Sequence, residues 1–270
     1  MNTVKDGPAE KAGVLPGDVV VEVDGLEMNG ATAEVVAAKC RGESGTQINI
    51  AVRHGGDGRA DGTIQQLTVT REQIKSNSVV ASTFDLDDGG KKVGLIKVPS
   101  FSTETTAQVS EALRQVRGSS AIVMDLRGNA GGYMPAGVDV AKLFLPQQSR
   151  VISEVDKSGR SIIYVADGIG SDTIVPLYIL VDRKTASASE ILTAALQDNH
   201  RATVIGETTF GKGRIQNVQE LQDGSGIAVT KAKYITPDGR DIHGVGIKPN
   251  KIPKVCGPND SAATCISGLI

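Results

Sequence analysis

The pattern of apolar and polar positions changes near residue 93. From there on, short apolar runs alternate with amphipathic stretches, and the run at 121–126 is nearly all apolar, as in a strand covered on both faces. The expected strands are 93–98, 121–126, 174–181 and 202–205. The expected helices are 103–117, 135–144 and 187–198, and a β-rich stretch follows at 215–235. Strands that alternate with helices predict an α/β (α+β) core in which helices pack on a sheet.

The first 75 residues are richer in turns and mostly β. An alternating strand at 19–23 runs into the hairpin turn Asp24-Gly25, and a further strand is expected at 47–53. Short helices are expected at 9–12 and 32–39. The glycine-rich stretch 54–62 is expected to be a loop, and 72–92 a linker that contains one strand.

Composition and charge exclude several classes of function. The 270 residues carry 29 basic and 31 acidic side chains with the signs interspersed, so no basic footprint for nucleic acid or a membrane surface is present. No apolar run reaches the roughly 20 residues that span a bilayer. No metal-ligand spacing and no phosphate-binding glycine loop appears, so no cofactor and no metal are expected. No signal peptide opens the sequence, which starts as if within a domain.

Three cysteines give little information on redox compartment. Cys40 lies in an apolar, helix-like stretch and is expected to be a buried thiol. Cys256 and Cys265 flank a short polar loop and can pair in an oxidising compartment, a pairing that the sequence leaves open.

A Ser-His-Asp triad finds little support. The three histidines are His54, His200 and His243, and His54 lies in a glycine-rich loop. The string GNAGG at 128–132 resembles the nucleophile loop of trypsin-like proteases, but Ala130 stands where that family has serine. A trypsin-like protease is therefore excluded.

Ser187 is the first candidate for chemistry. The string TASASE follows an apolar strand and opens a helix, and Glu190 three residues later makes an ordinary capping box the simplest explanation. The same geometry also suits a nucleophile. A serine at a strand-to-helix turn is exposed, and the N–H groups at the helix start can stabilise an oxyanion.

Lys212 is the second candidate. It lies between Gly211 and Gly213 and next to Phe210, in a loop that can approach another segment closely. The alternative is a solvated turn lysine. If Lys212 is buried beside Ser187, desolvation favours the neutral amine, which can take the hydroxyl proton as in serine-lysine dyads.

Several motifs in one order resemble those of the carboxyl-terminal processing proteases, also called tail-specific proteases. Ser187 and Lys212 are 25 positions apart (212 − 187) within TASASEIL and TFGKGRIQ. The matching segments elsewhere are DLRGNAGG at 125–132, ALQDN at 195–199 and YITPDGRDIHGVGIKPN at 234–250. The resemblance covers nearly the whole chain, so it is far more specific than any single motif.

The resemblance implies a set of site residues. Ser187 matches the nucleophile, Lys212 the general base, and Gln216 a glutamine that orients the lysine. The backbone N–H groups of Gly132 and Ala188 match the oxyanion hole. Outside this set, Ser189 is the rival nucleophile, though two residues further on it should face another side of the first turn. Asp125 and Arg127 are expected to be structural ion-pair partners.

The segment DGPAEKAGVLPGD looks like the PDZ domain that accompanies these proteases. The predicted organisation is a partial PDZ domain at 1–75, an α/β tail-specific protease core at 76–250 and a C-terminal tail at 251–270. In the family, a loop that binds the terminal carboxylate precedes this segment. Here the chain starts five residues before Asp6, so that loop is missing or the chain is a fragment of a longer enzyme.

The segments GRSIIYVADG and LQDGSGIAVTKAKY and the cysteine-bearing tail look most like the photosynthetic members. This resemblance implies maturation of a photosystem II reaction-centre precursor in the chloroplast thylakoid lumen; a bacterial periplasmic protease is the alternative. The expected partner is a protein with an extended C-terminal tail, itself membrane-bound or not, and the PDZ part is expected to gate access. A non-catalytic peptide-binding PDZ protein is the rival class. Retention of Ser187, Lys212 and Gln216 together argues against it.

Overall fold

The chain forms two compact units, Met1–Ser76 and Asn77–Ile270. The computed structural model describes residues 7–15, 17–54, 63–72, 79–86, 90–220, 226–257 and 260–269. Apart from His54, the predicted loop at 54–62 lies outside these ranges, as does much of the predicted linker.

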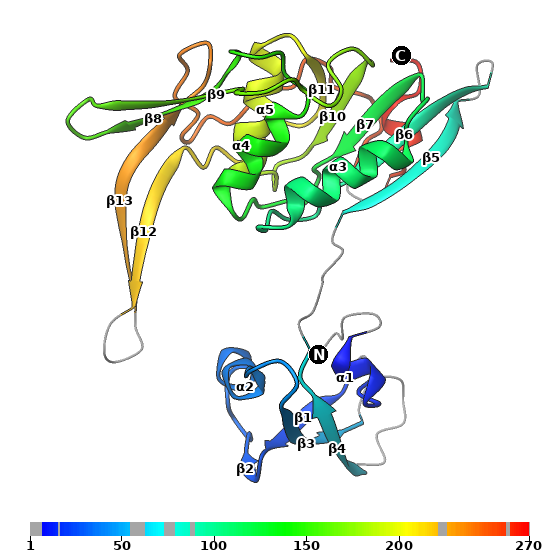
Figure 1. Ribbon diagram of the computed structural model, residues 1–270, viewed down its shortest axis with the longest axis vertical. Coiled ribbons are helices and arrows are strands. Elements are labelled where there is room, and N and C mark those ends of the chain that lie inside the picture. Colours follow the sequence, from blue (N-terminus) through cyan, green and yellow to red (C-terminus); the bar gives the residue numbers. More distant parts are fainter. Residues whose placement is uncertain are drawn as a thin grey trace. The chain divides into compact units, whose positions relative to one another are not determined.

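The first unit is a small antiparallel sheet with two helices (Figure 1). Its strands run in the order β2-β1-β3-β4. Their bounds are β1 Val19–Val23, β2 Leu26–Glu27, β3 Gln47–Arg53 and β4 Ile64–Thr70, and the helices are α1 Pro8–Lys11 and α2 Ala33–Cys40. The hairpin at Asp24-Gly25 is confirmed, since Val23 pairs with Leu26. Strand β4 was not predicted, because most of its side chains are exposed and only Val69 is buried.

The predicted α/β core is confirmed in the second unit. Its main sheet has the order β11-β10-β7-β6-β5, in which β6, β7, β10 and β11 are parallel and β5 pairs antiparallel at one edge. The bounds are β5 Val80–Leu86, β6 Lys91–Lys97, β7 Ala121–Asp125, β10 Leu177–Val181 and β11 Ala202–Gly206. The strand predicted from 174 begins only at Leu177, because Ile174 is 89% exposed and lies in a turn held by Asp172.

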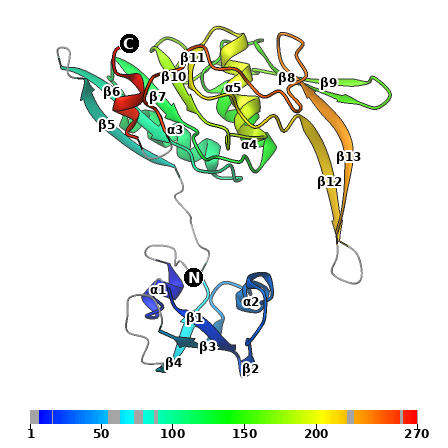
Figure 2. The same ribbon diagram turned by 180° about the vertical axis from the view of Figure 1, so that it is seen from behind.

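Helices cover both faces of this sheet. Helices α3 Thr105–Gln115, α4 Met134–Lys142 and α5 Ala188–Asp198 pack on one face against Met124 and Ile179. The short helix α6 Ala262–Ile266, which the sequence analysis did not predict, packs on the other face against Val123 and Leu180 (Figure 2). The C-terminal segment is therefore part of the core.

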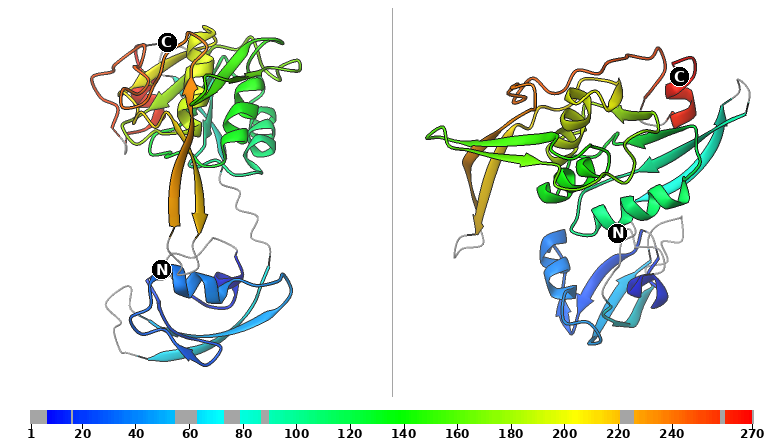
Figure 3. Two further views of the ribbon diagram at one scale, coloured as in Figure 1. Left: turned by 90° about the vertical axis from the view of Figure 1, so that its left-hand side faces the viewer. Right: turned by 45° about the horizontal axis from the view of Figure 1, so that its top comes forward.

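A second sheet, with the order β12-β13-β8-β9, extends from this core. Its strands are β8 Arg150–Asp156, β9 Ser161–Val165, β12 Arg214–Glu220 and β13 Gly226–Ile235, and β12 and β13 form a hairpin that stands apart from the body of the unit (Figures 1 and 3). The sequence analysis did not predict β8 and β9. In β8 the polar residues Ser153 and Glu154 are buried beside Val151 and Ile152, which breaks the apolar alternation.

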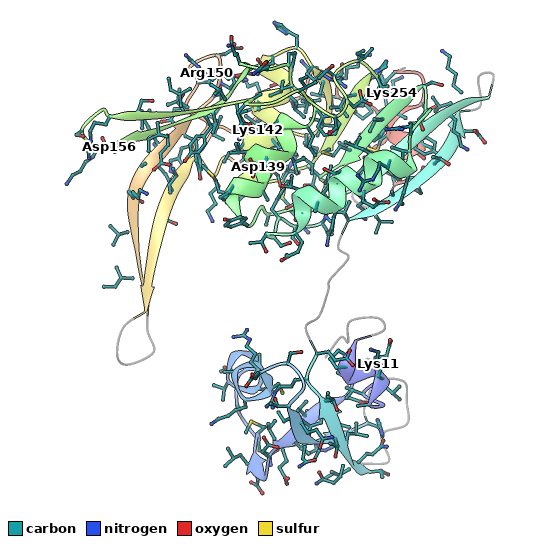
Figure 4. The ribbon with its side chains drawn as sticks, in the orientation of Figure 1. Lys11, Asp139, Lys142, Arg150, Asp156 and Lys254 are labelled. Carbon is teal, nitrogen blue, oxygen red and sulfur yellow. A yellow bond between two sulfur atoms is a disulfide. The ribbon has the colours of Figure 1, made fainter. Side chains whose placement is uncertain are left out.

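Charged side chains mark the outer parts of this unit (Figure 4). Lys142 at the end of α4 forms salt bridges with Asp139 and Asp167, and Asp156 at the end of β8 accepts hydrogen bonds that close the turn into β9. Within the described ranges, the helices are too short or too polar to span a bilayer.

Candidate active site

Loops that follow β7, β10 and β11 meet at the carboxyl edge of the parallel strands, the usual place for a site in such sheets. The Thr185 hydroxyl, after β10, donates to the carbonyl of Leu126, after β7, at 2.9 Å. The Phe210 N–H, after β11, donates to the Thr185 carbonyl at 2.9 Å. Ser187 and Lys212 lie two residues beyond Thr185 and Phe210, so the fold brings both predicted segments to this edge.

Ser187 occupies a strained backbone conformation at the start of α5. Its φ is 57° and its ψ is −117°, a combination that is unusual for any residue with a Cβ. Helices usually begin with an extended N-cap residue, so this turn is not an ordinary cap. Strain of this kind persists where surrounding contacts enforce it and gathers at functional sites. The Ser187 side chain is partly exposed, as a nucleophile must be.

Ser189, the rival nucleophile, is fully buried. Its hydroxyl donates to the Asn129 carbonyl at 3.1 Å, which ties the start of α5 to the glycine loop. This placement leaves Ser187 as the accessible hydroxyl of the pair.

The glycine loop 128–132 packs against the Ser187 turn. A Cβ on Gly131, with φ +101°, would lie 2.7 Å from the Ser187 Cβ and 3.1 Å from the Ala188 nitrogen. A Cβ on Gly132, with φ +135°, would lie 2.1 Å from the Phe101 carbonyl oxygen. Only glycine fits either position.

Two N–H groups beside Ser187 are free to bind an anion. Among the described residues, neither the Gly132 nor the Ala188 N–H donates to a protein acceptor, and Ala188 is the first residue of α5. Free N–H groups at a helix start carry positive potential. These are the two donors that the family resemblance implies for an oxyanion hole.

Glu190 connects the serine turn to the lysine loop. Its fully buried carboxylate accepts four hydrogen bonds: Oε2 from the N–H of Ser187 at 2.9 Å and of Lys212 at 2.8 Å, and Oε1 from the Gly211 N–H at 2.7 Å and the Thr209 hydroxyl at 2.6 Å. The predicted capping contact to Ser187 is therefore one of four. The sequence predicts only the cap, although a glutamate inside an apolar helix is a signal that it has buried partners.

The side chains of Lys212 and Gln216 are exposed. The sequence predicts a neutral Lys212 amine only if the side chain is buried beside Ser187. The fold brings the backbones of the two residues together but leaves the lysine side chain exposed. Gln216 lies on β12, next to a bulge between Ile215 and Gln216, and pairs with Thr230.

Asn129 and Asp182 support the site, and the sequence analysis missed both. The Asn129 amide donates to the Val98 carbonyl at 2.7 Å, and its Oδ1 accepts from the Gly131 N–H at 2.8 Å. Both carboxylate oxygens of Asp182 accept from the Gly128 N–H at 3.0 Å. Each is a polar residue shortly after an apolar strand, where burial is expected, and buried polar side chains nearly always have hydrogen-bond partners.

Asp125 and Arg127 form the predicted ion pair, which is confirmed. The Arg127 Nη2 and Asp125 Oδ2 atoms are 2.7 Å apart, and both side chains are buried. The hydrogen bond to Asp125 raises the pKa of the Arg127 guanidinium above its ordinary value, although burial opposes this. Cys256 and Cys265 are disulfide-bonded, and Cys40 is free and half-buried rather than buried. No group of three His, Cys, Asp or Glu side chains suited to a metal occurs in the described part of the chain.

A partly exposed serine in a strained turn, the N–H groups of Gly132 and Ala188 beside it and a nearby lysine loop thus lie together at one edge of an α/β core. The chain belongs to peptidase family S41, whose family model matches residues 92–252. A PDZ domain model matches residues 2–54.

Named relatives narrow the resemblance. The carboxyl-terminal-processing protease of Synechocystis sp. is 41% identical over 254 residues, covering 93% of this chain and 58% of the relative. The chloroplastic carboxyl-terminal-processing peptidase 2 of Arabidopsis thaliana is 41% identical over 265 residues, covering 96% and 50%. A solved structure of a photosystem II D1 C-terminal processing protease matches with a TM-score of 0.63 at 38% identity, covering 97% of this chain and 69% of that one. The chain thus spans between half and three-fifths of the length of these two curated relatives.

Proposed function

We propose that this chain is a serine endopeptidase that cleaves near the C-terminus of protein substrates, with Ser187 as nucleophile and Lys212 as general base. The observation that carries this proposal is the shared Glu190 carboxylate, which ties the backbones of Ser187 and Lys212 to one buried acceptor. A structural cap needs only the first of these contacts.

The proposed reaction is amide hydrolysis through an acyl-enzyme. Neutral Lys212 takes the Ser187 proton as the Ser187 oxygen attacks the scissile carbonyl carbon. The resulting oxyanion accepts hydrogen bonds from the N–H groups of Gly132 and Ala188. The Lys212 ammonium then protonates the departing amine, and water releases the acyl group by the same route. Gln216 orients the lysine amine.

The exposed Lys212 side chain fits a site that is completed by its substrate. An extended peptide lying across Ser187 displaces water from the loop at 209–213, and desolvation favours the neutral amine. Glu190 already holds the backbone of this loop at Gly211 and Lys212, so the proposed change concerns the lysine side chain. We propose that peptide binding supplies this burial.

The test compares the parent chain with Ser187→Ala and Lys212→Ala on an unstructured peptide that has a free apolar C-terminus. Both variants should lose at least about 10³-fold in kcat/KM, because the two residues act as one unit. Ser189→Ala tests the rival nucleophile, and it should remain active, since the Ser189 hydroxyl is buried and bonded to the Asn129 carbonyl and does not face the substrate. Cleavage by Ser187→Ala at the parent's rate would refute the nucleophile, and a folded but inactive parent would favour the peptide-binding alternative.

We further propose that the substrate is a photosystem II reaction-centre precursor and that the enzyme acts in the thylakoid lumen. Support comes from the chloroplastic and cyanobacterial relatives, and from the Cys256–Cys265 disulfide, which is typical of oxidising compartments. A bacterial periplasmic tail-specific protease shares the last feature and remains the alternative.

A peptide with the C-terminal extension of the D1 precursor separates these two proposals. The parent should release a single product from it and should cut a scrambled version of the same extension at least about tenfold more slowly, the discrimination expected from roughly 1.4 kcal/mol. Equal cleavage of both peptides would instead indicate a general tail-specific protease.

A further inference from the structure

Described residues of the disulfide-bonded C-terminal segment contact Arg127, which immediately precedes the glycine loop 128–132 of the candidate site. One edge of its guanidinium pairs with Asp125 at the end of β7, at 2.9 Å from Nε and 2.7 Å from Nη2. The remaining group, Nη1, donates to the carbonyls of Gly257 at 2.7 Å and Asp260 at 3.0 Å. The guanidinium therefore joins the sheet to the tail.

Both sulfur atoms of the disulfide lie against the same nitrogen. Arg127 Nη1 is 3.3 Å from Cys265 Sγ and 3.9 Å from Cys256 Sγ. Cys256 and Cys265 are nine positions apart, and their bond restricts the segment that presents both carbonyls. Cys265 lies on α6 and is fully buried in the cluster that packs on the sheet, which fixes one end of the segment.

Loss of these two carbonyl acceptors would be costly for Arg127. Its side chain is 7% exposed, so an Nη1 group without its two carbonyl acceptors would be a buried charged donor left unsatisfied. The guanidinium would then move toward water or another acceptor. Arg127 is directly bonded to Gly128, and Gly132 follows four residues later, so such a shift acts on the loop that carries a proposed oxyanion donor.

We propose that the disulfide-linked residues 256–257 and 260–265 position the oxyanion loop through Arg127, so that reduction of Cys256–Cys265 slows catalysis while the core stays folded. This inference rests on the proposed function. Reduction by a dithiol is balanced: its thiolate attacks one sulfur and forms a mixed disulfide, and its second thiol then displaces the protein thiol. Two electrons and two protons pass to the cysteines, and the dithiol becomes a cyclic disulfide.

The experiment uses the full chain before and after treatment with dithiothreitol, with thiol titration to follow the bond. Titratable thiols should rise from the single free Cys40 to all three cysteines. The turnover number kcat should then fall about tenfold with KM unchanged, because displacement of a transition-state donor by a fraction of an ångström affects the chemical step. Hydrogen exchange of the amides at 128–132 should speed up, whereas exchange in β7 and β10 should not.

Two variants serve as controls. The double variant Cys256→Ser, Cys265→Ser should match the reduced parent and should no longer respond to dithiothreitol. Cys40→Ser, in the other unit, should respond as the parent does. Unchanged kcat and unchanged exchange at 128–132 after complete reduction would overturn the proposal. Faster exchange throughout the core would also overturn it, because the disulfide would then stabilise the whole fold and not the loop in particular.

The exchange measurement separates this proposal from the proposed function. If the oxidised parent cuts no peptide, the proposed function fails, whereas local loosening at 128–132 on reduction still reports the link through Arg127. If the oxidised parent cuts and Ser187→Ala does not, the function stands whatever reduction does.

Discussion

The backbone N–H groups of Ser187 and Lys212 share one acceptor, the Oε2 atom of Glu190, at 2.9 and 2.8 Å. The two residues are far apart in the chain, and the contact is made from the first turn of a helix to a loop beyond the next strand. A single buried carboxylate thus fixes the spacing between the proposed nucleophile and the proposed base.

Glu190→Gln should therefore remove most of the activity and destabilise the core. An amide has one acceptor oxygen, and its NH₂ group would face N–H donors, so buried donors lose their partner at about 1–3 kcal/mol each. We expect the free energy of unfolding, measured with urea, to fall by at least about 3 kcal/mol and kcat to fall at least about 10²-fold. Glu111→Gln, on the exposed face of α3, is the control and should change neither value appreciably. Full activity in Glu190→Gln would show that the shared acceptor is dispensable.

Gly132→Ala should abolish activity, because the added Cβ would clash with the backbone of Phe101. A Cβ at this position would lie 2.1 Å from the Phe101 carbonyl oxygen, so the loop must move. Gly159→Ala is the matched control: its φ is also positive, at +83°, but nothing lies within 4 Å of its Cβ. The control should cost only the local strain of about 1–2 kcal/mol and keep its activity. Comparison of kcat and thermal unfolding for the two variants checks this, and equal activity would contradict it.

Asn129→Ala should destabilise the glycine loop. It removes the donor to the Val98 carbonyl and the acceptor for the Gly131 N–H, both in a fully buried position. We expect the free energy of unfolding to fall by about 2–4 kcal/mol, because two hydrogen bonds are broken and two buried groups are left unpaired. Asn29→Ala, at an exposed turn position of the first unit, provides the comparison and should change the free energy of unfolding little. A loss below about 1 kcal/mol at Asn129 would mean that water replaces both contacts.

The stability of the first unit should fall in acid through Asp18. Burial opposes ionisation of this carboxyl, but hydrogen bonds from the Leu15 N–H and His54 lower its pKa below the ordinary value of 3.8. A lowered folded-state pKa contributes stability that is complete above pH 3.8 and is lost as pH falls through the folded value. The difference in unfolding free energy between the parent and Asp18→Asn should thus shrink as the pH falls below about 4. A difference that grows in acid would contradict this sign.

Sequence patterns were sufficient where each element has one dominant cause. The apolar run of β7 and the strand-to-helix switch at Ser187 were visible because the parallel sheet buries both faces of its strands. Strands β8 and β9 were missed, because Ser153 and Glu154 are buried polar residues and β9 exposes Ile162 and Ile163, so neither strand shows the usual alternation.

The contacts that assemble the site were not predictable in the same way. Glu190, Asn129 and Asp182 each bond to backbone groups of a distant segment, and no local pattern indicates which segment a buried polar side chain will meet. The contact between the C-terminal segment and Arg127 could not be predicted either, since nothing in the sequence near Cys256 indicates that the Gly257 carbonyl accepts from Arg127. Family resemblance supplied the names of the site residues, and only the fold supplied the contacts between them.

Because these loops meet at the carboxyl edge of the sheet, the candidate site is complete only late in the folding of the chain. The glycine loop, the Ser187 turn and the Lys212 loop contact one another only across the sheet, so every link between them is a long-range contact that forms slowly. A nascent chain exposes the first loop long before the third has been synthesised. Under the proposed function, partly made chains would therefore be inactive, because the site is complete only after the last parallel strand has docked.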